Sequence, residues 1–281
     1  MPSLRLLFLF AILLALLLRV PNLNVRPMHG DEAVHAIKFG ALLQDGSYHY
    51  DPFEYHGPTL NYLSLIPAWL GAHGELAKVS DATLRSVPVF FGLALIVMLV
   101  WLKEGLSRPV VVVAAWLTAL SPAMTFYSRY YIQEMLLVCF TFGVIACGYR
   151  YAQQSRWHWA MLTGVFIGLM HATKETFIIA LAAMFVALLL TLFIPPLRGV
   201  SLRDEPTAHT PAPLKGGMFG SAIRLRHMLA ALAVAGIVSA LFFSSFFTHP
   251  AGIIDSVLTY KTYLNRAGEQ GWHLHPWYAY F

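Results

Sequence analysis

Charged residues are scarce in this sequence. Asp, Glu, Lys and Arg make up 12% of its 281 residues, whereas 58% are hydrophobic and the mean hydropathy is +0.61. A soluble domain of this size carries roughly twice that charged fraction. A large core could absorb part of the apolar excess, but not the uninterrupted apolar runs that recur along the chain. The composition therefore excludes an ordinary soluble domain and predicts an integral membrane protein.

Cysteine is nearly absent as well. The two present, Cys139 and Cys147, lie in one apolar stretch at a spacing that fits neither a metal site nor a disulfide, so we expect both to face lipid or the core. Basic residues exceed acidic ones, with a net charge of +5 and a pI near 9.2. Basic cytoplasmic loops of a membrane protein explain this excess better than nucleic-acid binding, so no nucleic-acid partner is expected.

Seven apolar segments are candidates for membrane-spanning helices, which need about 20 residues. They lie near 4–23, 86–102, 109–127, 135–150, 157–172, 176–194 and 228–247. The first could instead be a signal peptide. However, Arg19-Val20-Pro21 offers no small-residue cleavage site, which favours an uncleaved helix with Arg19 snorkelling to the interface. The sequence thus predicts one all-α, polytopic membrane domain over residues 1–281.

Charge patterning predicts the side of the membrane on which each connection lies. With the N-terminus inside, the inside segments hold ten basic and three acidic residues, as the positive-inside rule requires. Residues 195–227 then form a flexible cytoplasmic linker, and 24–82 a long outside loop with short amphipathic helices. Within that loop, 59–71 is too short to span and is typical of an interfacial or re-entrant helix. Because the sequence stops in a polar outside segment, we expect the domain to be C-terminally incomplete.

Ionisable residues gather in three of the predicted outside turns. Asp31 and Glu32 follow the first span, Arg129 and Glu134 lie in the next outside turn, and Lys174 lies in the third. Adjacent carboxylates beside a membrane are costly to desolvate, which indicates a function. A solvated helix start explains them equally well, since acids favour a first turn. Arg129 and Glu134 could likewise pair with each other or anchor helix ends.

A divalent metal is a second possible use of these groups. Nine of the twelve histidines fall outside in this topology, and His29, Asp31 and Glu134 are candidate ligands. Imidazole suits Zn, whereas carboxylates suit Mg or Mn. No pair has a recognised ligand spacing, so interfacial hydrogen bonding is the alternative role for most histidines.

The order of these motifs resembles the GT-C fold, the polytopic glycosyltransferases that use lipid-phosphate-linked sugars. The chain is most similar to the flippase-activity-associated proteins of archaeal-type N-glycosylation, with protein O-mannosyltransferases and the aminoarabinose transferases of lipid A as wider kin. The matching positions are Arg19-Val20, Asp31-Glu32, Tyr55 to Tyr62, Leu84 to Gly92, Ser128 to Glu134, Gly168 to Lys174 and His275 to Tyr278.

The resemblance implies an inverting sugar transfer at the outer face of the plasma membrane. The donor would be a polyprenyl-phosphate sugar, and the acceptor a protein, glycan or lipid. Asp31 takes the position of the catalytic base, with Glu32 as neighbour or alternate and Glu134 as the second acid. Arg85, Arg129 and Lys174 would hold the phosphate, and Tyr55 and His56 belong to a further substrate-binding stretch.

Two departures from the family pattern bear on the donor. Relatives often have Lys where this chain has His56, and a neutral imidazole is a weaker partner for phosphate. Many relatives have Asp where this chain has Glu134. Two other functions stay open: a lipid-linked sugar flippase or transporter, and a non-catalytic glycosylation partner. Mid-helix positions nearly free of charge count against transport, since transport needs ionisable groups along the path.

Overall fold

The computed structural model describes residues 3–53, 56–193 and 224–268, and within these ranges the chain is helical without strands. The predicted all-α class is therefore confirmed. The helices are α1 (Leu4–Arg19), α2 (Gly30–Asp45), α3 (Thr59–Ala72), η1 (Leu76–Lys78), α4 (Asp81–Met98), η2 (Leu99–Leu102), α5 (Lys103–Leu106), α6 (Arg108–Leu120), α7 (Pro122–Ser128), α8 (Glu134–Gln154), α9 (Trp157–His171), α10 (Phe177–Phe193), α11 (Leu225–Phe243) and α12 (Ala251–Gly268).

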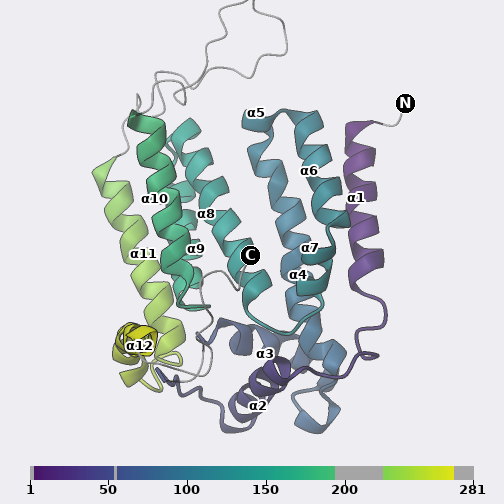
Figure 1. The fold of residues 1–281 in the computed structure, drawn as a ribbon, viewed down its shortest axis with the longest axis vertical. Helices are drawn as coiled ribbons and strands as arrows, with labels where there is room; N and C mark the ends of the chain where they lie inside the picture. Colours follow the sequence, from purple (N-terminus) through teal and green to yellow (C-terminus); the bar gives the residue numbers. More distant parts are fainter. Residues whose placement is uncertain (1–2, 54–55, 194–223, 269–281) are drawn as a thin grey trace, which may run out of the picture.

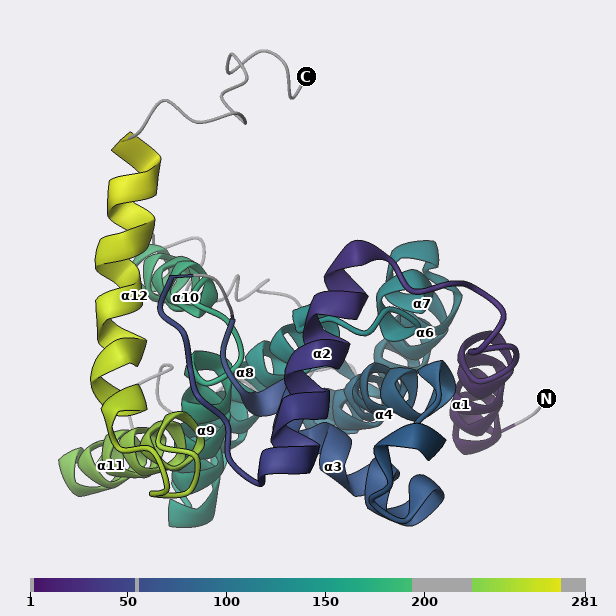
Figure 2. The same cartoon turned by 90° about the horizontal axis from the view of Figure 1, so that it is seen from below.

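The long helices run up and down one bundle, and three others lie across one end of it. Figure 1 shows α1, α4, α6, α8, α9, α10 and α11 side by side, with the N-terminus and α5 at the top. Helices α2, α3 and α12 lie across the bottom, where Figure 2 shows them from below. We call these ends the α5 end and the α2 end. Helix α3 covers the short segment 59–71, and its place across the bundle fits the interfacial interpretation.

Six of the seven predicted spans each overlap one long helix, and 109–127 covers two, α6 and α7, but fewer helices are long enough to cross a membrane. Among the described residues, three helices are long and apolar enough to cross a membrane: Asp81–Leu106, Glu134–Gln154 and Leu225–Phe243. A fourth is added if α6 and α7, bent by 63°, count as one span. Helices α1 and α9 have 16 and 15 residues. The seven-span topology therefore stays a prediction.

The break between α6 and α7 has a clear cause in the sequence. Pro122 has no N–H to donate and so cannot continue the α6 hydrogen-bond ladder. The freed carbonyls of Thr118 and Ala119 instead accept hydrogen bonds from the Arg19 guanidinium, at 2.9 and 3.0 Å. Arg19 is completely buried in this position. Its predicted snorkelling to the interface is therefore wrong, because broken-helix carbonyls offer it partners inside the protein.

Close packing of α9 on α11 depends on two glycines. A Cβ at Gly164 or Gly168 would overlap the backbone carbonyl of Ala231 or Ala235 on α11. This four-residue spacing of small residues lets membrane helices approach closely. Elsewhere the outward faces are apolar, as at Leu9, Leu13 and Leu17 of α1. Cys139 and Cys147 are buried and unpaired, which assigns them to the core.

Candidate functional site

A cavity of about 530 Å³ opens at the α2 end of the bundle. The three turns that the sequence singles out meet around it, from the start of α2, the start of α8 and the α9–α10 connection. Its lining consists of Asp31, Val34, His35, His56, Ile132, Gln133, Glu134 and Lys174. Four of the predicted site residues thus share one polar cavity: Asp31, His56, Glu134 and Lys174.

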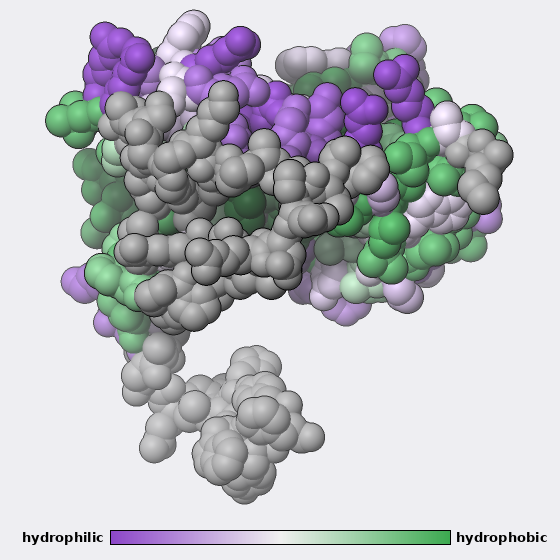
Figure 3. All heavy atoms as spheres, turned by 90° about the horizontal axis from the view of Figure 1, so that it is seen from above, coloured by the Kyte–Doolittle hydropathy of each residue, from purple (hydrophilic) through white to green (hydrophobic). Residues whose placement is uncertain are grey.

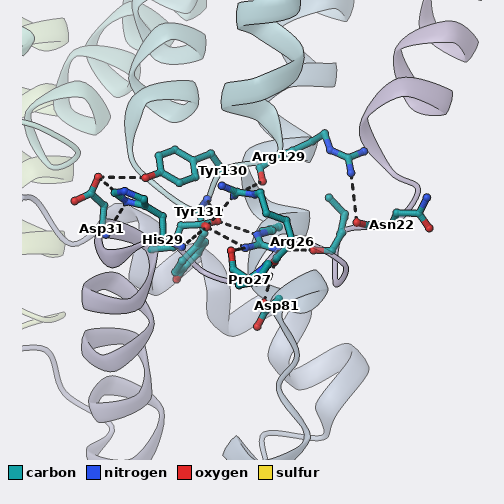
Figure 4. Close-up of polar contacts among 12 residues, drawn as sticks. Asn22, Arg26, Pro27, His29, Asp31, Asp81, Arg129, Tyr130 and Tyr131 are labelled. Atoms are coloured by element: carbon teal, nitrogen blue, oxygen red, sulfur yellow. Dashed lines mark hydrogen bonds and ion pairs between the residues drawn. The ribbon is translucent and has the colours of Figure 1, made fainter.

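Asp31 presents its carboxylate at the edge of this cavity. Its side chain is 67% exposed, and its Oδ2 accepts a hydrogen bond from the Tyr130 hydroxyl at 3.2 Å and lies 3.4 Å from His29 Nδ1. Figure 4 shows His29 and Tyr130 beside Asp31. Burial, together with the Asp31 carboxylate, raises the pKa of Tyr130 to about 12, so this phenol remains a hydrogen-bond donor. The carboxylate is held loosely and remains open to a ligand.

Glu32, the next residue, is completely buried and does not line the cavity. Its two oxygens accept hydrogen bonds from Arg85 at 2.8 and 2.9 Å, from Arg26 at 2.8 Å, and from the backbone N–H groups of Tyr131 and His29 at 2.9 and 3.1 Å. Burial alone would raise the pKa of Glu32, but these hydrogen bonds outweigh burial and the pKa is lowered. Glu32 therefore joins α2, α4 and the turn before α8 through hydrogen bonds to its carboxylate.

Arg85 completes that junction from α4. Its side chain is 1% exposed, and besides Glu32 it donates hydrogen bonds to the carbonyls of Leu23, Arg26 and Pro27. The guanidinium therefore fixes the chain that leads into α2, of which Figure 4 labels Arg26 and Pro27. Arg85 does not line the cavity. It was predicted to bind the phosphate, but in the structure it supports the start of α2 through Glu32.

Glu134 and Lys174 form the charged pair of the cavity. Lys174 Nζ donates to Glu134 Oε1 at 2.6 Å, and the other oxygen, Oε2, is buried with no hydrogen-bond partner within the described structure. Glu134 begins α8, where the helix dipole favours a carboxylate. A buried acceptor without a hydrogen bond costs free energy unless a ligand or a water molecule donates one to it. Glu134 Oε2 therefore marks a position where a ligand can bind.

His56 is held against the α9–α10 connection. Its Nδ1 lies 2.7 Å from Glu175 Oε2, and Glu175 also accepts a hydrogen bond from the Tyr50 hydroxyl at 3.4 Å. The next residue must be small, because a Cβ at Gly57 would overlap the carbonyl of Ala172. Glu175 thus holds the imidazole at the cavity wall.

His35 and Gln133 are cavity residues that the sequence-based site lacks. His35 is buried, its Nδ1 lies 3.2 Å from Gln133 Nε2, and its ring stacks with His56 at 6.2 Å. Burial, followed by the charge of His56, lowers the pKa of His35 to about 4, so it is neutral at pH 7. His35 could have been predicted from the sequence, because it follows Asp31 by four residues and so lies on the same side of α2.

Other predicted residues lie elsewhere. Arg129 donates to the carbonyls of Leu18, Arg19 and Asn22, at 3.1 to 3.4 Å, and so caps the end of α1 outside the cavity. Tyr55 lies outside the described residues, as does the motif from 275 to 278.

The metal candidates do not form a metal site. In the part of the chain that the structure describes, no three His, Cys, Asp or Glu side chains are grouped to hold a metal ion. His29 lies beside Asp31, whereas Glu134 is bonded to Lys174. The fold therefore does not bring the three candidate ligands together around one ion.

Comparison with known proteins identifies the fold and the family. The family model described as dolichyl-phosphate-mannose-protein mannosyltransferase matches residues 64–205. The Saccharomyces cerevisiae protein O-mannosyltransferase Pmt1–Pmt2 complex, bound to the sugar donor, matches with a TM-score of 0.61 and 16% identity, over 90% of this chain and 34% of that chain. An Archaeoglobus fulgidus oligosaccharyltransferase in complex with Zn and sulfate matches with a TM-score of 0.58 and 18% identity, over 93% of this chain and 36% of that one.

Both matches confirm the GT-C-like fold predicted from the motif order. This chain spans about a third of the length of these solved chains. No curated protein sequence matches it.

Proposed function

The chain belongs to the dolichyl-phosphate-mannose-protein mannosyltransferase family, and we propose that it transfers a sugar from a polyprenyl-phosphate donor to an acceptor outside the cytoplasm. The cavity at the α2 end carries this proposal, because an open carboxylate and a cation, Asp31 and Lys174, line the same 530 Å³ space. The α5 end carries Lys103, Arg108 and Arg156, which favours a cytoplasmic position for it. The donor headgroup and the acceptor would then meet in the cavity on the opposite side, at a plasma membrane.

The chemistry is a single displacement at the anomeric carbon. The acceptor oxygen or nitrogen bonds to that carbon as the bond to the phosphate oxygen breaks, with inversion of configuration. Asp31 takes the proton that the acceptor loses, as a general base. Lys174 stabilises the negative charge that accumulates on the departing polyprenyl phosphate. Glu134 orients Lys174 with one oxygen and offers the other, Oε2, to the acceptor.

The remaining charged residues act as supports in this proposal. Glu32 and Arg85 hold the start of α2 in place, and Arg129 caps α1. His56, whose Nδ1 lies 2.7 Å from Glu175 Oε2, would meet the sugar or phosphate with its other ring nitrogen. The acceptor class (protein, glycan or lipid) and the narrower resemblance to the flippase-activity-associated family are parts of the proposal that the sugar-transfer assay must define.

The test is sugar transfer by purified full-length protein with a polyprenyl-phosphate sugar as donor. Asp31→Asn should lower the transfer rate by about 10²- to 10⁴-fold, the usual contribution of a general base, while donor lipid still binds. Asp45→Asn is the matched control, since Asp45 is an exposed acid at the far end of the same helix. It should transfer at the wild-type rate.

Two results would contradict this assignment. If Asp31→Asn transfers as fast as Asp45→Asn, Asp31 is not the base. If the wild-type protein binds the donor lipid but transfers no sugar to any acceptor class, the flippase or non-catalytic partner replaces the enzyme as the better interpretation.

A further inference from the structure

A second cavity, of about 840 Å³, lies at the α5 end, opposite the candidate site. It is formed where the first turns of α1 and α6 face the η2–α5 corner. Its lining is Ser3, Leu4, Arg5, Phe8, Leu9, Val100, Lys103, Arg108, Val111 and Val112. The proposed glycosyl transfer uses none of these residues.

Three cations line this cavity, and of these Lys103 lies within electrostatic reach of an acid, Glu104. Arg5, Lys103 and Arg108 form no ion pair or side-chain hydrogen bond within the described residues. The nearest acid along the chain, Glu104, is instead paired with Arg150. Three positive charges beside one hollow repel one another, and an anion at the centre would relieve that repulsion.

Two helix N-termini add to the positive field. Helix α1 begins at Leu4 and helix α6 at Arg108, and both first turns line the cavity. The Ser3 hydroxyl already accepts a hydrogen bond from the Leu6 N–H, and Pro109 in the first turn of α6 has no N–H to donate. The positive end of each helix dipole and the remaining first-turn N–H groups still favour an anion. The cations and both helix ends therefore select the same kind of ligand, one with a phosphate-like charge.

The rest of the lining is apolar, which narrows the class of ligand. Phe8, Leu9, Val100, Val111 and Val112 form a hydrocarbon surface next to the three cations. Figure 3 views this end of the bundle and shows hydrophilic atoms across it, with hydrophobic atoms at its flanks. A small soluble anion would use the cations alone, whereas an anionic phospholipid places its phosphate on the cations and an acyl chain on the apolar wall.

We propose that this cavity binds an anionic phospholipid of the leaflet at the α5 end, with its phosphate among Arg5, Lys103 and Arg108. Such a leaflet is negatively charged when it faces the cytoplasm. Bound there, the lipid would join α1 to α6 at the end away from the candidate site. This role is separate from sugar transfer and stands or falls independently of it.

The test is lipid binding to purified full-length protein, followed by native mass spectrometry. The probes are phosphatidylglycerol and phosphatidylcholine with the same acyl chains, and glycerol 3-phosphate as the headgroup without chains. Phosphatidylglycerol should bind more tightly than the other two. Each cation-to-glutamine change at Arg5, Lys103 or Arg108 should weaken it about five-fold, and the triple variant about a hundred-fold. Arg156→Gln, a change of an exposed cation at the same end but outside the cavity, should leave binding unchanged.

Several results would overturn the proposal. The first is equal binding of phosphatidylglycerol and phosphatidylcholine. The second is displacement of phosphatidylglycerol by glycerol 3-phosphate at the same concentration. The third is a loss of lipid affinity in Arg156→Gln as large as in the cavity variants. If the triple variant does not fold, the three single variants provide the same comparison. Unchanged binding in all three singles would likewise refute a phosphate site here.

Discussion

The sharpest prediction concerns Glu32, because its neighbour Asp31 is assigned a different role. Glu32→Gln keeps the size of the side chain but leaves the Arg85 guanidinium, 1% exposed, without its carboxylate. Breaking a buried ion pair by removing one partner costs about 3–5 kcal/mol. We therefore expect a clear fall in the thermal unfolding temperature in detergent, and loss of transfer only because the start of α2 is displaced.

Controls separate this scaffold role from chemistry. Asp81 is the outer partner of Arg85, 3.7 Å away and 35% exposed, so Asp81→Asn should cost about 1 kcal/mol or less. The double variant Glu32→Gln with Arg85→Met should be less destabilised than the sum of the two single changes, since neither charge is then left unpaired. A Glu32→Gln protein that melts like wild type but does not transfer sugar would refute the scaffold role and make Glu32 part of the chemistry.

The same variant has a predicted pH dependence. Because the folded-state pKa of Glu32 lies below its ordinary value of 4.5, the charged carboxylate stabilises the fold above that pH. This stability is lost as the pH falls through the lowered pKa. The difference in unfolding temperature between wild type and Glu32→Gln should therefore be constant near neutral pH and shrink in acid. A difference that grows toward low pH would contradict the assignment.

Two further predictions rest on burial and close packing. The pKa of His35 is lowered from 6.5 to about 4, so the free energy of unfolding of the wild-type protein should fall as the pH drops through this range, by about 3 kcal/mol at most. Unfolding temperatures of wild type and His35→Gln should therefore diverge between pH 6.5 and about pH 4. Parallel curves would contradict this prediction. Gly164→Ala should destabilise the α9–α11 contact by about 1–3 kcal/mol, because the added methyl meets the Ala231 carbonyl. Gly236→Ala, where the added methyl meets nothing within 4 Å, should melt no lower than wild type.

Much of the site was predictable because hydropathy fixes where each helix ends. Long apolar segments that alternate in direction place every second turn at the same end of a bundle. Asp31, Glu134 and Lys174 come from three such turns and do line one cavity. Prediction of this grouping needed no knowledge of side-chain packing, only the order of the helices and the short, transverse α3.

The opposite roles of Asp31 and Glu32 depended on how α2 packs. Glu32, Phe39 and Leu42 are buried, and their spacing puts them on one face of the helix. Asp31 is about 100° around the helix axis from Glu32, so it faces out when Glu32 faces in. The apolar positions Phe39 and Leu42 already mark the buried face in the sequence, and extending that face by two turns reaches Glu32.

The arginines were harder to place because their partners are backbone carbonyls, which a sequence pattern does not distinguish. Arg19, Arg85 and Arg129 each donate to two or more carbonyls, at a broken helix, a loop and a helix end respectively. A guanidinium has five donors in a rigid fork and suits such positions, whereas an ammonium is a compact charge on a flexible stem. Lys174 is the cation that lines the candidate cavity, bound to one carboxylate oxygen. The cation type thus separates the two positions: the arginines satisfy backbone carbonyls at the α2 end, and the lysine lines the cavity in which we propose that the donor phosphate binds.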